Sequence, residues 1–254
     1  MKLKTNKLKE MKLIFSAISD MNDEVKLSFS DKFMEFEAMD KSNTTYCRLK
    51  VVSTFFDEYE PELDGICFKT KDLKEYLNMP REGDSIILSI TEDKSTLMME
   101  VLGNINQFFT MPLLAGLESQ DIPKNYPSIV AVKESKYTLW THSVKPDTDK
   151  LIMAVKNLNK MGTAPVTFKI KDKKFSLLKI EELKKGEIFF GIYELPDMSA
   201  SFNSSFIEKF CTLAPISESV EIHMKDNYPI LFNLFKLNSF QISYMTAPLV
   251  DLNS

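Results

Sequence analysis

Few residues in this chain have the type and spacing that enzyme chemistry needs. Its 254 residues include two histidines, His142 and His223, which lie far apart in the sequence. A Ser or Cys nucleophile is usually activated by a nearby base, and zinc needs several closely spaced His or Cys ligands. His223 falls on the polar side of an alternating strand pattern, and His142 follows Trp140 by two positions. The sequence therefore predicts no metal centre and no histidine-activated nucleophile.

The familiar catalytic and phosphate-binding motifs are absent as well. The sequence contains no GxSxG, GxxxxGK[ST], GxGxxG or HExxH, and it has only seven glycines. Cys47, Cys67 and Cys211 lack close spacing, which is typical of a reducing compartment and speaks against zinc and disulfides. The acidic cluster at residues 57–62 is interpreted as a solvated loop. We therefore expect no catalytic residue, no cofactor and no enzyme activity.

The composition is that of an ordinary globular chain. Hydrophobic residues make up 44% and charged residues 27%, and the length allows one large domain or two of ordinary size. A net charge of −4 argues against a general nucleic-acid-coating protein, although it does not exclude a local basic face. No apolar run reaches the roughly 18 residues that span a bilayer, and the charged N-terminus lacks a signal-peptide core. A soluble, intracellular protein is expected.

One pattern occurs four times along the chain and indicates an internal repeat. Each copy has alternating apolar residues, a polar pair with an Asp, and a second alternating run, which predicts a β-hairpin that turns at the Asp. Any β-rich chain contains some hairpins, but four copies, each preceded by a helical segment, favour a true repeat. The copies cover residues 25–38, 86–101, 166–180 and 220–234, with turns at Asp31, Asp93, Asp172 and Asp226.

A short amphipathic helix is expected before each hairpin. Asn6 and Thr148 are candidate N-caps, and Pro80 and Gly162 are candidate helix ends. Apolar residues recur at helical spacing on one side, and lysines lie on the other. On the pattern alone, these lysines are interpreted as a solvated helix face. The expected helices cover residues 6–20, 71–79, 148–160 and 203–213.

The order helix, hairpin, extra strand therefore occurs four times, which predicts an α+β fold. Residues 112–127, PLLAGLESQDIPKNYP, contain three prolines and have no clear period, so they are expected to be an interdomain linker. The predicted domains are residues 1–111 and 128–254. Within the second domain, residues 128–132 are interpreted as β-like and residues 137–147 as strand and loop.

Four segments in register resemble sliding DNA clamps of the PCNA (proliferating cell nuclear antigen) type. In FEAMDKSNTTYCRLKV, the residues Met39, Asp40 and Ser42 stand where this family has its Met-Asp-Ser motif at the end of a strand. The other three segments resemble the family's linker, the end of its last helix with the following strand, and its C-terminal Ala-Pro motif. They are ESQDIPKNY, CTLAPISESVEIHM and YMTAPLV. The resemblance runs over almost the whole chain.

The resemblance implies the DNA-clamp fold, with two similar domains that each contain two helix–hairpin repeats. Three chains would close head to tail into a ring, with the sheets outside and the short helices lining a channel around duplex DNA. Lysines on these helices would then attract the phosphate backbone without reading bases. The implied DNA-facing residues are Lys7, Lys9, Lys12, Lys71, Lys74, Lys156, Lys160 and Lys209.

The resemblance also implies a groove for short peptides of polymerases, nucleases and ligases. An apolar patch built from a linker and two chain segments fits a small interface of this kind. The alternative is that the same residues only hold the linker against the protein. The implied groove residues are Met39, Leu117, Ile122, Pro123, Tyr126, Pro229, Pro248 and Val250.

The sequence departs from the family pattern at several places. The fourth helix has hydroxyl residues where basic ones are frequent, so its positive lining is thinner. Asn43 and Thr44 replace a more usual His and apolar residue beside the groove, and Gln120 replaces a frequent Leu. Residues 137–147 look like an insertion before the third helix. The hydroxyl residues of the fourth helix are Ser204, Ser205 and Thr212.

The expected function is a sliding clamp, a processivity factor that encircles duplex DNA as a homotrimer and tethers replication and repair enzymes. The clamp is expected at sites of DNA replication, with a clamp loader as a partner and no membrane association. Subunits would join through edge strands near residues 105–111 and 179–188. One alternative is a subunit of a hetero-oligomeric or checkpoint-type clamp that recruits partners. Another is a β-rich enzyme with an unrecognised site, which the missing catalytic residues disfavour.

Overall fold

The structure, a computed structural model, describes residues 1–115, Ile122 and residues 126–249. The chain divides into two units. Unit 1 comprises Met1–Lys41, Cys47–Ile122 and Lys236–Gln241, and unit 2 comprises Ser42–Tyr46, Pro123–Phe235 and Ile242–Ser254. Each unit therefore takes short segments from the other half of the sequence. The predicted domain boundaries and the linker at residues 112–127 stay a prediction.

Unit 1 contains two of the four repeats. Its main sheet has the strand order β5-β1-β7-β8-β9, and a second run of strands has the order β6-β2-β3 followed by β4. Its elements are β1 (Lys2–Thr5), α1 (Leu8–Met21), β2 (Glu24–Phe29), β3 (Phe33–Met39), β4 (Thr45–Val52), the 3-10 helix η1 (Ser53–Phe55), β5 (Glu58–Glu60), β6 (Gly65–Lys69), α2 (Thr70–Leu77), β7 (Ser85–Ile90), β8 (Thr96–Leu102) and β9 (Gln107–Pro112).

Unit 2 contains the other two repeats. One sheet has the strand order β13-β12-β11-β14, and another run of strands has the order β10-β15-β16-β17. Its elements are α3 (Pro127–Lys133), β10 (His142–Val144), α4 (Thr148–Asn159), β11 (Val166–Lys171), β12 (Lys174–Glu181), β13 (Lys184–Ile192), β14 (Met198–Phe202), α5 (Ser204–Leu213), the 3-10 helix η2 (Ala214–Ile216), β15 (Ser219–Met224), β16 (Ile230–Lys236) and β17 (Phe240–Thr246).

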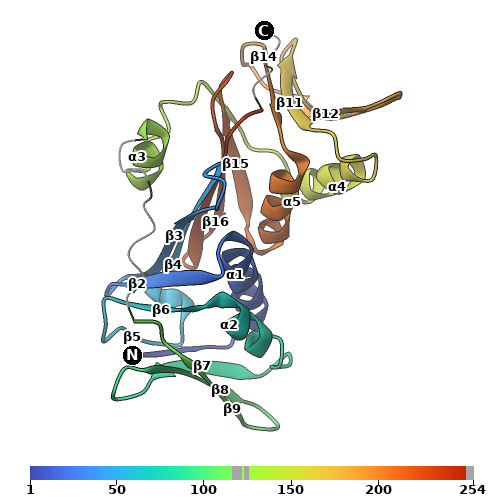
Figure 1. Cartoon of the computed structure of the whole chain (residues 1–254). Coiled ribbons are helices and arrows are strands. Elements are labelled where there is room, and N and C mark those ends of the chain that lie inside the picture. Colours follow the sequence, from blue (N-terminus) through green and yellow to red (C-terminus); the bar gives the residue numbers. More distant parts are fainter. Residues whose placement is uncertain (116–121, 123–125, 250–254) are drawn as a thin grey trace. The chain divides into compact units, whose positions relative to one another are not determined.

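All four predicted helix–hairpin–strand repeats are present (Figure 1), which confirms the α+β fold. They are α1-β2-β3-β4, α2-β7-β8-β9, α4-β11-β12-β13 and α5-β15-β16-β17. The third hairpin shows why an Asp marks the turn. Asp172 and Lys173 separate the paired residues Lys171 and Lys174, and both have positive φ, 50° and 64°. A two-residue type I′ turn requires this backbone, which Asp tolerates better than most residues do.

Residues 128–132 form part of α3 and not the predicted strand. Pro127 occupies the first turn, where its missing N–H costs nothing. Ser128, Ile129, Ala131 and Val132 are buried, which is the spacing of one helix face. The apolar run SIVAV fits a strand equally well by composition, so local periodicity alone gave the wrong element.

Neither predicted N-cap is correct. Lys7 occupies the N-cap position of α1 without a side-chain capping bond, and its own N–H donates to Thr5 Oγ1 at 3.1 Å. Asn6 therefore does not cap the helix. At α4 the cap is Asp147, whose Oδ1 accepts from the Lys150 N–H at 2.8 Å, and Thr148 is the first helical residue. A carboxylate also interacts favourably with the helix dipole at this end.

The two helices of unit 1 are antiparallel neighbours. Lys12 of α1 donates to the carbonyl of Pro80, just beyond α2, at 3.0 Å. Further along α1, Asp20 pairs with Lys74 of α2 at 3.3 Å. The early part of α1 therefore lies beside the end of α2, and the end of α1 lies beside the middle of α2, so the two helices run antiparallel. The buried side of α1 faces the interior of the unit, and it consists of Leu8, Met11, Ile14, Phe15, Ile18 and Met21.

The corresponding helices of unit 2 join in the same way. Thr70, the first residue of α2, donates its hydroxyl to the carbonyls of Asn22 and Asp23 just after α1. Ser204, the first residue of α5, donates its hydroxyl to the carbonyls that follow α4, those of Thr163 and Ala164, at 3.2 and 3.0 Å. This duplicated contact supports the internal repeat at the level of single hydrogen bonds.

A buried lysine holds the end of α4. Lys179 of β12 is 0% exposed, and its Nζ donates to the Gly162 carbonyl at 2.6 Å. Burial disfavours the charged amine and lowers the pKa of Lys179. The folded chain therefore binds this proton less tightly than the unfolded chain does. As a result, the free energy of unfolding gains a contribution as the pH rises from the folded-state pKa of Lys179 towards the ordinary lysine pKa.

Lys179→Met is expected to remove this alkaline contribution while it retains the aliphatic packing. Urea denaturation of both proteins at neutral pH and at about pH 10 would measure it. On going to the higher pH, the wild-type protein should gain stability relative to the variant. Parallel pH profiles for the two proteins would show that the buried amine does not titrate differently on folding.

Candidate nucleic-acid interface and partner groove

In unit 1, the predicted DNA-facing lysines fall into two groups. Lys9 and Lys71 are exposed on α1 and α2. Lys7, Lys12 and Lys74 are half-buried and already engaged within the unit. Lys7 Nζ donates to the Phe55 carbonyl at 2.8 Å and lies 4.7 Å from the centre of the Phe55 ring. These three lysines hold parts of the unit together, so their charges are less available to a ligand.

In unit 2, the three predicted lysines are all exposed. Lys156 and Lys160 are four positions apart at the end of α4, a spacing that places side chains on one side of a helix. Lys209 of α5 lies 5.8 Å from the centre of the Phe206 ring. The hydroxyl of Thr212 donates back to the Lys209 carbonyl at 2.7 Å. α5 contributes one of the predicted lysines and α4 with its C-cap contributes two, so the polar side of α5 carries less positive charge.

The predicted groove residues are only partly described. Met39 ends β3 in unit 1, where it is half-buried, and Ile122 is also half-buried. In unit 2, Tyr126 is 57% exposed and Pro229 and Pro248 are half-buried. The predicted residues Leu117, Pro123 and Val250 lie outside the described residues, as does Gln120.

The stretch of residues 137–147, which the resemblance did not explain, contacts the main chain at Pro229 through Trp140. Trp140 Nε1 donates to the Pro229 carbonyl at 2.6 Å, and the Trp140 ring meets the Tyr228 ring edge-on at 5.6 Å. Tyr137 stacks on His223 at 4.6 Å. Sequence reasoning missed this aromatic cluster, and the single tryptophan was the only local signal for it. Of the predicted strand and loop, β10 supplies the strand, which pairs with β15.

The histidines and cysteines occupy structural positions. His142 Nε2 lies 3.1 Å from the Pro196 carbonyl, and burial lowers the pKa of His223, which favours its neutral form. Burial raises the pKa of the Cys47 and Cys211 thiols to about 12, so neither is an activated nucleophile. Across the residues that the structure describes, no three His, Cys, Asp or Glu side chains form a metal-binding group.

The segments that the resemblance implies as subunit contacts, residues 105–111 and 179–188, contain most of β9 and, after the end of β12, the first part of β13. β9 ends the main sheet of unit 1, and β13 ends one sheet of unit 2. Both carry exposed apolar side chains, Phe108 at 72% and Phe189 at 54% exposure. Ile192 of β13 is 73% exposed. Exposed apolar edge strands offer unpaired backbone groups to another chain, so single proteins usually protect them.

No helix in the described part of the chain is long and apolar enough to span a membrane.

Comparison with known proteins gives one family match and several relatives. The model of the Rad9 family matches residues 11–108. A DNA polymerase sliding clamp of Methanothrix thermoacetophila is 24% identical over 245 residues, covering 92% of this chain and 93% of the relative. The DNA polymerase sliding clamp of Nanoarchaeum equitans is 22% identical over 247 residues, covering 96% and 97%.

Solved structures agree with these relatives. A chain of the PCNA2–PCNA3 complex from Sulfolobus tokodaii matches with a TM-score of 0.84 at 18% identity, covering 98% of this chain and 99% of that chain. PCNA from Thermococcus kodakaraensis matches with a TM-score of 0.82 at 16% identity, with the same coverage. The chain therefore has the DNA-clamp fold. The predicted resemblance to PCNA-type sliding clamps is confirmed, and the chain's homologues carry the name DNA polymerase sliding clamp.

Proposed function

We propose that this protein is a sliding clamp, a processivity factor that encircles duplex DNA and tethers a DNA polymerase to it. The observation that carries the proposal is the likeness to clamps over almost the entire chain, both in sequence and in fold. The fourfold repeat agrees with it, because each unit supplies one pair of short helices with lysines on the exposed side. The protein would act at sites of DNA replication.

DNA would be held by charge alone. The exposed lysines of α1, α2, α4 and α5 would attract phosphates, release counterions and leave the protein free to slide. Lys12 and Lys74 would contribute less, because each already contacts the neighbouring helix or its end. The contribution of α5 would be small, since Glu208 adjoins its only lysine, Lys209.

Partner enzymes would bind through short peptides with an apolar plug. Met39, Tyr126, Pro229 and Pro248 would supply part of this groove, and the Trp140 Nε1–H donates to the Pro229 carbonyl. The protein itself would carry out no chemistry, in keeping with the structural roles of its histidines and buried cysteines. Nucleases and ligases would be recruited in the same way as the polymerase, and a loader would place the clamp on DNA.

Several chains are needed to surround DNA, and we propose a homotrimer. β9 of one chain would pair with β13 of the next, which would cover the exposed Phe108, Phe189 and Ile192. A head-to-tail contact of this kind closes into a ring when the rotation between subunits is a simple fraction of a turn.

A heteromeric clamp is the second candidate. The fold likeness to a chain from a complex of two different PCNA proteins favours it. Native mass measurement of the isolated protein separates the two candidates. A homotrimer supports the first candidate, and a monomer that assembles only with a second clamp-like chain supports the other.

Primer extension on a long single-stranded template tests the function itself. The polymerase and loader of the source organism are used with and without the protein, and an excess of unlabelled primed template limits each polymerase to one binding event. Longer products in the presence of the protein are expected. Equal product lengths at saturating protein would contradict the proposed function.

A further inference from the structure

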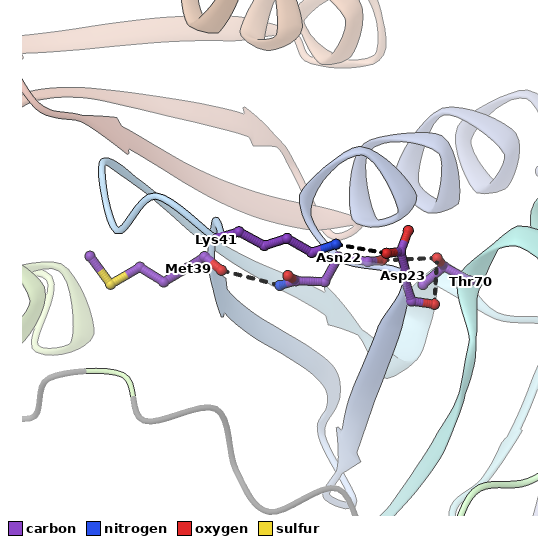
Figure 2. A network of polar contacts seen from close by, with 5 residues as sticks. All are labelled: Asn22, Asp23, Met39, Lys41 and Thr70. Carbon is purple, nitrogen blue, oxygen red and sulfur yellow. Dashed lines mark hydrogen bonds and ion pairs between the residues drawn. The ribbon is translucent and has the colours of Figure 1, made fainter.

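A set of buried and part-buried hydrogen bonds joins the end of α1, the start of α2 and the end of β3 (Figure 2). Asn22, the first residue after α1, is 6% exposed, and Thr70 is 1% exposed. Asn22 Nδ2 donates to the Met39 carbonyl at 3.2 Å, and the Asn22 carbonyl accepts from Thr70 Oγ1 at 2.9 Å. Asn22 therefore contacts the other two elements at once.

Thr70 fixes this helix end by two further bonds. Its hydroxyl lies 3.1 Å from the Asp23 carbonyl, and its backbone N–H donates to the same carbonyl at 2.9 Å. The side chain of Asp23 points elsewhere and pairs with Lys41 at 2.9 Å, where the two side chains are 82% and 80% exposed. The bonds of Asn22 and Thr70 are thus separate from this exposed ion pair, which water screens.

The matching site in unit 2 shows what is particular to Asn22. There, Ser204 repeats the role of Thr70, but the link to the strand runs in the opposite direction. Lys179 of β12 donates to the Gly162 carbonyl, so a strand side chain holds the helix end. In unit 1, a side chain at the helix end holds the main chain of the strand. Only the arrangement in unit 1 fixes a strand carbonyl, and that carbonyl belongs to a predicted groove residue.

We propose that Asn22, supported by Thr70, is a positioning residue for partner binding. It fixes the main chain at Met39 and thereby the place from which the Met39 side chain meets an apolar peptide plug. A carbonyl can only accept a hydrogen bond, so the Asn22 amide nitrogen is the atom that performs this role. The inference rests on the proposed function, and it adds a residue that does not itself touch the peptide.

The sharpest test is Asn22→Asp, which keeps the shape but places an acceptor oxygen against the Met39 carbonyl. If Met39 leaves its position for much of the time, the apparent Kd of the peptide rises by the inverse of the competent fraction, about three- to tenfold. Thr70→Val, which removes the supporting hydroxyl, should have a smaller effect in the same direction. Thr70→Ser retains the hydroxyl and should restore binding.

The probe is a fluorescein-labelled peptide with an aromatic–aliphatic plug, taken from the polymerase of the source organism. Its Kd is measured by anisotropy with the assembled protein, and amide hydrogen exchange of residues 38–42 is measured alongside. Asp23→Asn is the matched control, because it removes only the exposed ion pair and should leave both readouts unchanged. Met39→Ala, a direct groove variant, should weaken the peptide without faster exchange.

Faster exchange at residues 38–42 together with a weaker peptide, in Asn22→Asp and Thr70→Val alike, is the expected result. Equal peptide affinity in wild type and both variants, with melting temperatures that show them folded, would overturn the positioning role. If the wild-type protein fails to bind the probe, the proposed partner groove itself is wrong. The two failures are therefore distinguishable.

Discussion

Phe108→Asp is expected to dissociate the proposed ring into monomers. Phe108 lies on the edge strand β9 and is 72% exposed within the single chain, so its burial would come from the next subunit. A central aromatic side chain typically contributes about 2–4 kcal/mol to an interface, and a carboxylate in its place would also lose water without gaining a partner. In a symmetric ring, this loss of binding free energy occurs at every interface. Sedimentation velocity measures the result.

The matching change on the other edge strand, Ile192→Asp in β13, should have the same effect, because each interface would use both strands. Leu237→Asp is the control, since Leu237 is 77% exposed but lies in the turn between β16 and β17. It should sediment like the wild type. Rings that persist in both edge variants would mean that subunits join through other surfaces.

Removal of the exposed helix lysines is expected to abolish most of the gain in primer extension. Each phosphate contact that is lost lowers the magnitude of the slope of log K against log salt by about 0.9, and several contacts per chain together change affinity by orders of magnitude. The fold should be unaffected, because all five side chains are exposed. The variant carries Lys9→Ala, Lys71→Ala, Lys156→Ala, Lys160→Ala and Lys209→Ala.

A charge-matched control separates location from net charge. The same number of exposed lysines on strands and turns is replaced, and this control should retain both the extension gain and the salt slope. Equal loss in the two variants would show that overall charge, and not the helix faces, holds the DNA. The control carries Lys26→Ala, Lys32→Ala, Lys94→Ala, Lys171→Ala and Lys174→Ala, which are all exposed positions.

The sequence allowed the repeat architecture to be predicted because alternation and helical spacing are local. The four hairpins and the helices before them needed nothing but neighbouring residues. α3 could not be identified in this way, since a short apolar run is compatible with a strand and with one helical turn. The predicted N-caps, Asn6 and Thr148, each lie one residue from the observed N-caps, Lys7 and Asp147, because the cap depends on where the chain enters the helix.

The site was harder to predict, because its parts come from distant positions. Helical spacing places Lys12 and Lys74 on polar faces, but it cannot reveal that Pro80 and Asp20 bind them. The links from Asn22 to Met39 and from Trp140 to Pro229 end on backbone carbonyls, which every residue has. No pattern of residue types marks such contacts, so only the folded structure reveals them.

Retention on circular DNA tests the central claim most directly. The protein is loaded onto a nicked circular duplex, separated from unbound protein by gel filtration at raised salt, and measured again after a single restriction cut. A ring that surrounds DNA without tight contacts should remain on the circle and be lost from the cut molecule within minutes. Equal loss from both forms, or equal retention on both, would contradict encirclement.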